Sequence, residues 1–351
     1  MSAHRPTPAA PVGIEIAESG TRISAAFGHL AHDTRVVARF PAPPSPEDAV
    51  AKISQLAREA LRRLSDIGME GDAYHVEHRD EWFARVPIKS AVAVVGRVSR
   101  GAVVSLPQAP EWAGFPLGKR LTEALGGLTQ IVSETNAAGF AELSVGAGRD
   151  HLDVLYVHLG RAVTSAYVTG ARFLTGAHGA EGLLGHMWVR ADGPRCACGV
   201  RGHLDPIASS QAVVRTMIGR ASDREESLDA MLRVTGGRAE AISAQQSVRL
   251  AEEGDAVARA VLDDALDALA LALSNAVALL APGVIVLAGP LAEAGPAFFD
   301  PLTERLRATC RHLPESPALV PAVLGVRAPL IGAQLLSLGI SAERLDESSE
   351  A

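Results

Sequence analysis

Two of the chain's three cysteines and two of its histidines lie in one short segment between His186 and His203. Cys196 and Cys198 are separated by one residue, and two of the four residues between Cys198 and His203 are glycines, which let the backbone turn tightly. Thiolate sulfur and imidazole nitrogen are the ligands that zinc prefers, and four of them close a tetrahedral, structural site. The spacing predicts such a site, formed by His186, Cys196, Cys198 and His203. The alternative is two buried cysteines near two surface histidines.

The composition limits the class of protein. The chain has 351 residues, of which 48% are hydrophobic and 21% charged, which is enough for two globular domains. Its formal net charge of −7 argues against a protein that coats nucleic acid or anionic membrane. Because three cysteines make no disulfide framework, we expect a reducing, cytoplasmic compartment. No uncharged apolar run reaches the length of a membrane span.

The two ends of the chain differ from the rest in composition. Residues 1–11 contain prolines and alanines without an apolar core segment, so we expect a disordered leader and not a signal peptide. Residues 341–351 are acidic and small, which predicts a flexible tail.

Hydrophobic periodicity predicts strands and helices that alternate along the chain. The predicted strands are 12–27, 34–40, 91–95, 101–106, 130–132, 153–159, 165–168, 284–287 and 319–324, with Pro321 indicating an edge position for the last. The predicted helices are 46–64, 116–125, 136–143, 206–218, several segments up to 280, 298–306 and 332–338. Residues 68–89 match no element. Strands pair first and then alternate with helices, twice over, which predicts an α/β protein of two halves with a cleft between them.

The cysteine segment resembles the zinc signature of the ROK family, which groups repressors and sugar kinases. The matching residues are Gly185-His186, Cys196-Ala197-Cys198-Gly199 and Gly202-His203, with His203 in place of the family's last Cys. Residues 110–117, 136–142 and 282–289 resemble three further family segments, and the likeness extends over about residues 12–338. The resemblance implies an actin/hexokinase-like (ribonuclease H-like) α/β fold and a homodimer.

The resemblance also implies a domain division. The smaller N-terminal α/β domain is expected over residues 12–128 together with a C-terminal helix over 332–340. The larger domain, with the zinc site, is expected over residues 129–331.

A sugar kinase needs a carboxylate that takes the proton from the attacking hydroxyl. Glu134 stands where the family has this base as an Asp. Its extra methylene moves the carboxylate by about 1 Å, a displacement that can cost on the order of a hundredfold in rate. The alternative is that Glu134 caps a helix beginning at Asn136.

The two phosphate-binding loops of the family are altered in this chain. The first loop, over residues 12–21, lacks the adjacent glycines, and its Gly20-Thr21 pair is interpreted as an ordinary turn. The second, over residues 159–166, keeps only Gly160, next to Arg161, which could pair with phosphate. Gly289 marks the end of the nucleotide strand but is followed by Pro290, which has no N–H. Gly160, Arg161 and Gly289 are the candidate nucleotide contacts.

The sugar site implied by the resemblance is partly preserved. Its candidate contacts are Gln108, Glu134, His186 and Asp205. Leu183 replaces a sugar-binding Glu and cannot accept a hydrogen bond from a hydroxyl.

Damage to both phosphate loops and to the base argues against turnover of ATP with Mg²⁺. The leading interpretation is therefore a ROK-like, zinc-stabilised regulator or sugar sensor without direct nucleic-acid contacts, because residues 1–11 are too short for a helix-turn-helix domain. The alternative is an ATP-dependent kinase that phosphorylates a hexose or amino sugar. A third hypothesis is a purely structural dimerisation module.

Overall fold

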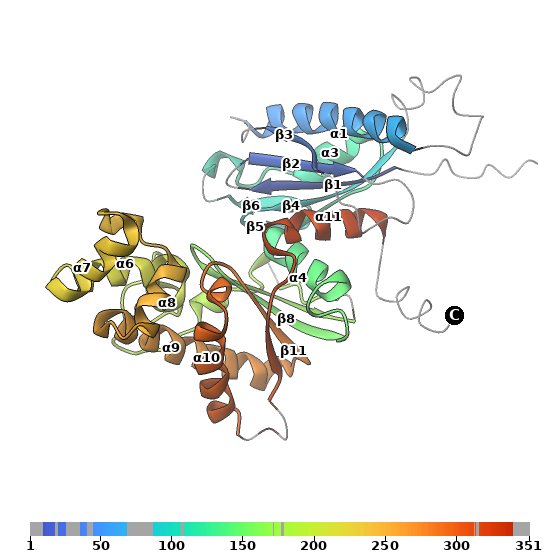
Figure 1. Cartoon of the computed structure of the whole chain (residues 1–351). Helices are drawn as coiled ribbons and strands as arrows, with labels where there is room; N and C mark the ends of the chain where they lie inside the picture. The colour runs from blue at the N-terminus through green and yellow to red at the C-terminus, as the bar shows by residue number, and fades with distance from the viewer. Residues whose placement is uncertain are drawn as a thin grey trace, which may run out of the picture. The chain divides into compact units, whose positions relative to one another are not determined.

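The structure, a computed structural model, describes residues 10–17, 20–25, 36–40, 45–68, 87–106, 109–170, 172–176, 179–311, 313 and 316–339. The chain divides into two compact units. The first comprises residues up to Ser144, Gly170–Ala180 and residues from Val326; the second comprises Val145–Thr169 and Glu181–Gly325. Figure 1 shows the elements of both units.

The first unit contains a five-stranded sheet in the order β3-β2-β1-β4-β7. Its strands are β1 (Ala10–Ala17), β2 (Gly20–Ala25), β3 (Val36–Phe40), β4 (Ile88–Val94) and β7 (Thr129–Ser133). β1 pairs antiparallel with β2 and parallel with β4, and β7 is parallel to β4. The single strand predicted over 12–27 is wrong, because the chain reverses there and Ala17 pairs with Gly20. Gly20 and Thr21 therefore begin a strand and do not form the predicted turn.

The predicted boundary between residues 128 and 129 differs from the division in the structure. β7 begins at Thr129 and extends the first sheet beside β4, and α4 (Glu134–Val145) follows it directly. Both elements therefore belong largely to the first unit, which continues to Ser144. The sequence pattern located the strand but gave no indication of which sheet it joins.

Helices cover both faces of the first sheet: α1 (Pro46–Gly68) and α3 (Leu117–Leu125) lie on one face, and α11 (Ala328–Leu338) lies on the other (Figure 1). β4 alternates accordingly, since Val92 and Val94 join the core with α1 and α3, whereas Ala91 and Ala93 join a smaller core with α11. Ser45 caps α1 as its hydroxyl accepts the Asp48 N–H at 3.1 Å. A hairpin of β5 (Arg97–Ser99) and β6 (Ala102–Ser105) also lies in this unit.

The second sheet has the order β10-β9-β8-β11-β12. Its strands are β8 (Asp153–Leu159), β9 (Val163–Thr169), β10 (Arg172–Phe173), β11 (Val284–Ala288) and β12 (Ala318–Pro321). β8 pairs antiparallel with β9 and parallel with β11, which repeats the arrangement of β1 with β2 and β4. β12 lies at the sheet edge, as Pro321 predicted, although it ends at that proline rather than at residue 324.

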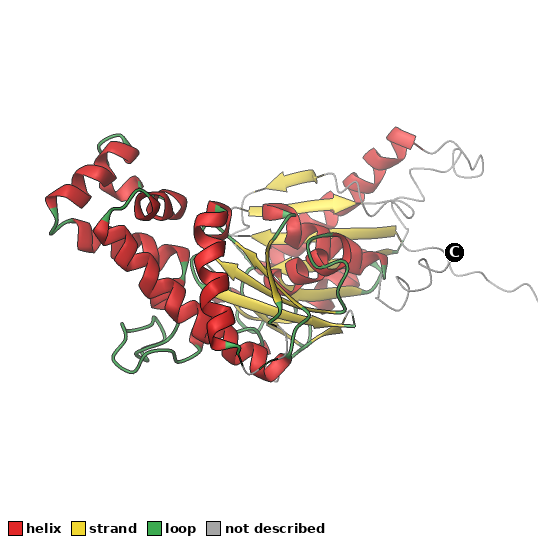
Figure 2. Cartoon of the chain, turned by 60° about the horizontal axis from the view of Figure 1, so that its bottom comes forward, coloured by secondary structure: helices red, strands yellow, loops and turns green. Residues whose placement is uncertain are grey.

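The rest of the second unit is mostly helical, as the red ribbons of Figure 2 show. Its helices are α5 (Asp205–Ala208), α6 (Ser210–Ala221), α7 (Glu225–Thr235), α8 (Ala244–Glu252), α9 (Ala256–Leu280) and α10 (Pro296–Thr309). α9 is the central helix, because it packs against α5, α6, α8 and α10 and contributes buried side chains along most of its length. Among the helices of the described residues, none has the length and apolar character needed to cross a bilayer.

Candidate functional site

Residues 184–204 fold into a compact structure that we call the knuckle. Its last segment, residues 200–204, forms backbone hydrogen bonds with the two earlier segments of the knuckle. The Leu204 N–H donates to the Met187 carbonyl at 2.9 Å, and the Cys196 N–H donates to the Val200 carbonyl at 2.8 Å. Gly202 lies at the centre, with its N–H bonded to the Pro194 carbonyl at 3.1 Å. The knuckle thus brings segments on either side of the cysteines together.

Gly202 is required by the close approach of these segments. Its φ is +81°, and a Cβ there would lie 1.9 Å from the Arg190 carbonyl oxygen. Gly199 also has a positive φ, of +92°, but a Cβ there would meet nothing within 4 Å. Both glycines turn the chain in the left-handed region that other residues avoid. Of the two glycines, only Gly202 also lies so close to the backbone of Arg190 that a Cβ would collide with it.

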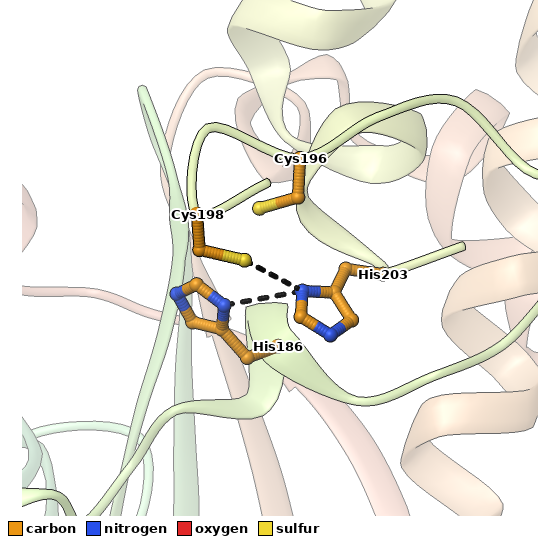
Figure 3. Close-up of side chains that lie close together, drawn as sticks. All are labelled: His186, Cys196, Cys198 and His203. Carbon is orange, nitrogen blue, oxygen red and sulfur yellow. Dashed lines mark hydrogen bonds between the residues drawn. The ribbon is translucent and has the colours of Figure 1, made fainter. Parts of the chain in front are cut away.

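The four predicted metal ligands converge in the knuckle (Figure 3). Their ligand atoms all lie within 4.8 Å of one another. The Nδ1 atoms of His186 and His203 are 3.2 Å apart, and Cys198 Sγ lies 3.4 Å from His203 Nδ1. In a zinc tetrahedron, bonds of about 2.0 Å to nitrogen and about 2.3 Å to sulfur give ligand separations of about 3.3 Å between two nitrogens and about 3.6 Å between nitrogen and sulfur. The spacing and the donor types therefore fit zinc.

Cys196 is the buried member of this group, with 5% of its surface exposed. Burial raises the pKa of the Cys196 thiol, so a metal that binds there must displace a proton from sulfur. Four protein ligands leave zinc no open coordination position, and the metal would therefore be structural.

An ion-pair network connects the knuckle with helices α6 and α9 of the second unit. Asp264, on α9, pairs with Arg190 of the knuckle at 3.2 Å and with Arg220 of α6 at 2.9 Å. All three side chains are partly exposed, so the network positions the knuckle more than it stabilises the fold. Sequence reasoning missed Asp264, because no local pattern links residues so far apart.

Asp205, a predicted sugar contact, is engaged by the backbone of β9. Its Oδ1 accepts the Val163 N–H at 2.5 Å. A Cβ on Gly185 would lie 2.6 Å from the same oxygen, so the carboxylate also packs against the start of the knuckle. Burial raises the pKa of Asp205, and the Val163 N–H and the nearby histidines oppose that rise. Asp205 therefore joins the end of the knuckle to the first residue of β9.

The second predicted phosphate loop is the turn between β8 and β9. Leu159 pairs with Val163, which leaves a three-residue turn that begins at Gly160. The Gly160 N–H donates to the Ala162 carbonyl at 3.1 Å. Gly289 follows β11 with φ +98°, and a Cβ on it would lie 2.5 Å from the Leu159 carbonyl oxygen. The structure thus brings Gly160 and Gly289 together at the carboxyl ends of two parallel strands, beside the exposed Arg161.

His158 is a residue at this edge that sequence reasoning missed. Its ring lies against Gly160, where a Cβ would come 2.5 Å from the His158 Cε1. Burial lowers the pKa of His158, and the nearby Glu293 carboxylate opposes that effect only in part. The imidazole is therefore neutral at neutral pH. A single histidine within the apolar run 154–159 was the available signal.

The other residues that the sequence analysis singled out lie outside the knuckle and the β8–β9 turn. Glu134 is the first residue of α4, and the Ser133 hydroxyl accepts the Asn136 N–H at 3.1 Å, so the alternative that Glu134 caps a helix beginning at Asn136 is wrong. Leu183 is 38% exposed and immediately precedes the knuckle. Gln108 lies outside the described residues.

Comparison with known protein families matches residues 76–339 to the ROK family. The chain belongs to the ROK family. It is 32% identical over 206 residues to a glucokinase of Thermotoga maritima, a match that covers 59% of this chain and 64% of that enzyme. The chain thus spans less than two thirds of the length of this ROK relative.

Solved ROK structures share the fold. A ROK glucokinase from Streptomyces griseus, in complex with glucose and AMPPNP, superposes with a TM-score of 0.70 at 22% identity, covering 94% of this chain and 100% of that one. A ROK transcriptional regulator, a homologue of the E. coli MLC protein, superposes with a TM-score of 0.71 at 21% identity, covering 94% and 78%. The predicted actin/hexokinase-like α/β fold is confirmed.

Proposed function

We propose that this protein is a sugar-binding regulator or sensor of the ROK family that has lost ATP-dependent phosphoryl transfer. The observation that carries the proposal is the hydrogen bonding of the β8–β9 turn. A phosphate loop works by presenting free backbone N–H groups to phosphate oxygens. In this turn the Gly160 N–H is bonded to the Ala162 carbonyl, and the Val163 N–H is bonded to the Asp205 carboxylate.

Charge and packing at the turn support the same proposal. The Asp205 carboxylate, bonded to the turn's last N–H, would repel a phosphate anion. The neutral ring of His158 covers Gly160 on the side that a side chain would occupy, and supplies no positive charge. Pro290, after Gly289, removes another N–H donor. Arg161 is the one cation that the turn itself contributes.

The zinc site belongs to the proposal as a structural element. His186, Cys196, Cys198 and His203 would hold the metal, which would fix the knuckle ahead of α5 and supply no reacting group. His186 and Asp205 then remain the proposed sugar contacts of the second unit, and Glu134 and Gln108 those of the first. We further propose a cytoplasmic homodimer that does not contact nucleic acid directly.

A sugar kinase is the second candidate. It is favoured by the likeness to a protein named glucokinase and by Glu134 at the first turn of α4, where the family's base is expected. In that case Glu134 would take the proton from the attacking hydroxyl and Arg161 would assist the phosphate.

An ADP-release assay with ATP and Mg²⁺ separates the two candidates. It should be run over hexoses and amino sugars on the zinc-loaded protein, with thermal-shift measurements on the same sugars. We expect saturable stabilisation by a sugar and no sugar-dependent release of ADP. Release that disappears in Glu134→Gln, but persists in the exposed control Glu252→Gln, would establish the kinase and overturn the proposal. No stabilisation by any sugar would leave only the dimerisation module.

A further inference from the structure

Two arginines face each other across the outer strand pair of the knuckle. Arg195 and Arg201 form an isolated antiparallel bridge. The bonds on either side of it run from the Cys196 N–H to the Val200 carbonyl and from the Gly202 N–H to the Pro194 carbonyl. This is the pattern of a non-hydrogen-bonded pair, in which the two Cβ atoms lie about 4.5–5.5 Å apart and both side chains project from the same face.

Within the described residues, Arg195 and Arg201 form no ion pair with a carboxylate. The long contact of Arg201 Nη1 with the Gly193 carbonyl oxygen, at 3.5 Å, leaves the charge of the guanidinium unbalanced because that oxygen is neutral. Other arginines of the second unit do pair with carboxylates: Arg190, Arg220, Arg249 and Arg305. Two like charges directly opposite each other repel, and an anion held between them removes that repulsion.

The knuckle holds this pair in a defined geometry. Arg195 directly precedes the metal ligand Cys196, and Arg201 directly precedes Gly202, whose packing against the Arg190 carbonyl admits no side chain. Zinc with two thiolates and two neutral imidazoles has no net charge, so the metal site would not neutralise the arginines. Both side chains are exposed to solvent.

An exposed aromatic ring lies on the neighbouring segment of the knuckle, where Trp188 forms an isolated antiparallel bridge with His203. Trp188 is 64% exposed, and its Nε1 lies 2.7 Å from where a Cβ of Gly202 would be, next to Arg201 in the chain. An exposed indole offers an apolar face and an N–H donor. The knuckle therefore exposes two cations and one indole within a short stretch of paired backbone.

We propose that Arg195, Arg201 and Trp188 form a binding site for a small phosphate monoester, with the phosphate dianion between the two guanidiniums and the organic part against the indole. A phosphate dianion matches two positive charges and offers three terminal oxygens to two forked donors, whereas a carboxylate matches one. The site is independent of the proposed function, because it uses none of the candidate sugar or nucleotide contacts.

Titration calorimetry on the zinc-loaded protein tests the site, with glucose 6-phosphate, inorganic phosphate, acetate and glucose as probes. We expect the phosphate ester to bind, acetate to fail, and added salt to weaken binding of the ester. Any binding of glucose belongs to the proposed sugar contacts and should be the same in the arginine variants as in the wild type. Arg195→Gln and Arg201→Gln should each weaken binding by about tenfold, and the double variant by more. The control is Arg259→Gln, which removes an exposed arginine of α9 and should change nothing.

Zinc content and thermal unfolding of each variant show whether the knuckle is intact. Wild-type affinity in a zinc-loaded double variant would overturn the proposal, as would the absence of phosphate-ester binding to the wild type. Trp188→Phe should reduce the fluorescence quenching by the ester, since Trp112 is 1% exposed. Trp82, the third tryptophan, lies outside the described residues and is replaced by Phe in both proteins for this measurement. Equal affinity for inorganic phosphate and the ester would overturn the role given to Trp188.

Discussion

The knuckle allows a matched pair of glycine substitutions that separates backbone strain from packing. Gly199→Ala and Gly202→Ala both place an alanine in the left-handed region, at φ of +92° and +81°. That strain costs about 1–2 kcal/mol in each variant. A Cβ at position 199 would meet no atom within 4 Å, whereas a Cβ at position 202 would lie 1.9 Å from the Arg190 carbonyl oxygen. The difference between the two variants therefore reports the packing of the knuckle.

Relieving the contact at position 202 requires the Arg190 carbonyl to move by more than an ångström. That carbonyl accepts the Gly193 N–H at 3.1 Å, and the Gly202 carbonyl accepts the N–H groups of Val189 and Arg190 at 2.8 and 3.2 Å. Losing two or three such bonds at about 1 kcal/mol each adds about 2–3 kcal/mol to the strain. Since the pairing positions His203 beside the cysteines, we expect Gly202→Ala to bind zinc about 30- to 150-fold more weakly than Gly199→Ala.

Competition with a chromophoric chelator measures the zinc affinity of both variants, and metal analysis gives the stoichiometry. We expect one zinc per chain in the wild type and in Gly199→Ala, with a melting temperature lower by about 2–4 °C per kcal/mol in each variant. Equal zinc affinity in the two variants would refute the reasoning, because it would mean that the paired segments do not hold the ligands. A stable wild type that takes up no zinc would refute the ligand assignment itself.

Two further predictions concern the fold. Gly332→Ala should destabilise the protein by at least about 2 kcal/mol, because a Cβ there would lie 1.9 Å from the Ala137 carbonyl oxygen. Gly219→Ala, whose Cβ would have no atom within 4 Å, should instead stabilise α6 by about 0.5–1 kcal/mol. Denaturant unfolding measures both changes. The lowered pKa of His158 means that, below the unfolded-state pKa of about 6.5, the unfolded chain binds a proton that the folded protein excludes, so stability should fall as the pH drops from neutral toward the folded-state pKa. His158→Gln should reduce that fall in melting temperature, and an unchanged pH dependence would contradict the half-buried, neutral imidazole.

Much of the fold could be predicted from the sequence, because strand and helix periodicity is local. The β8 strand was predicted with its observed bounds, and α3 within one residue. What failed depended on long-range pairing. The predicted strand over 12–27 hides a hairpin, since its alternation continues through the reversal between Ala17 and Gly20. The predicted domain boundary at residue 128 differs from the division after Ser144, because the pattern of Thr129–Ser133 says nothing of which sheet the strand extends.

The candidate site likewise has a part that could be predicted from the sequence and a part that could not. Ligand type and spacing were enough to predict the convergence of His186, Cys196, Cys198 and His203, because the knuckle is continuous in sequence. The contact of Asp205 with the Val163 N–H and the contact of His158 with Gly160 were not predictable, since each depends on where a side chain turns after the backbone is placed.

The link between the knuckle and the β8–β9 turn explains why the proposed loss of kinase activity would not depend on one residue. His203, a candidate metal ligand, lies two residues before Asp205, so the knuckle delivers the Asp205 carboxylate to the Val163 N–H. Ala162→Gly would remove a side chain from the turn but leave that N–H bonded. It would equally leave the Gly160 N–H bonded to the carbonyl of residue 162, which every amino acid carries. Recovery of a phosphate loop therefore requires the turn to change its hydrogen bonding, and with it the contact that joins β9 to the metal-bearing segment.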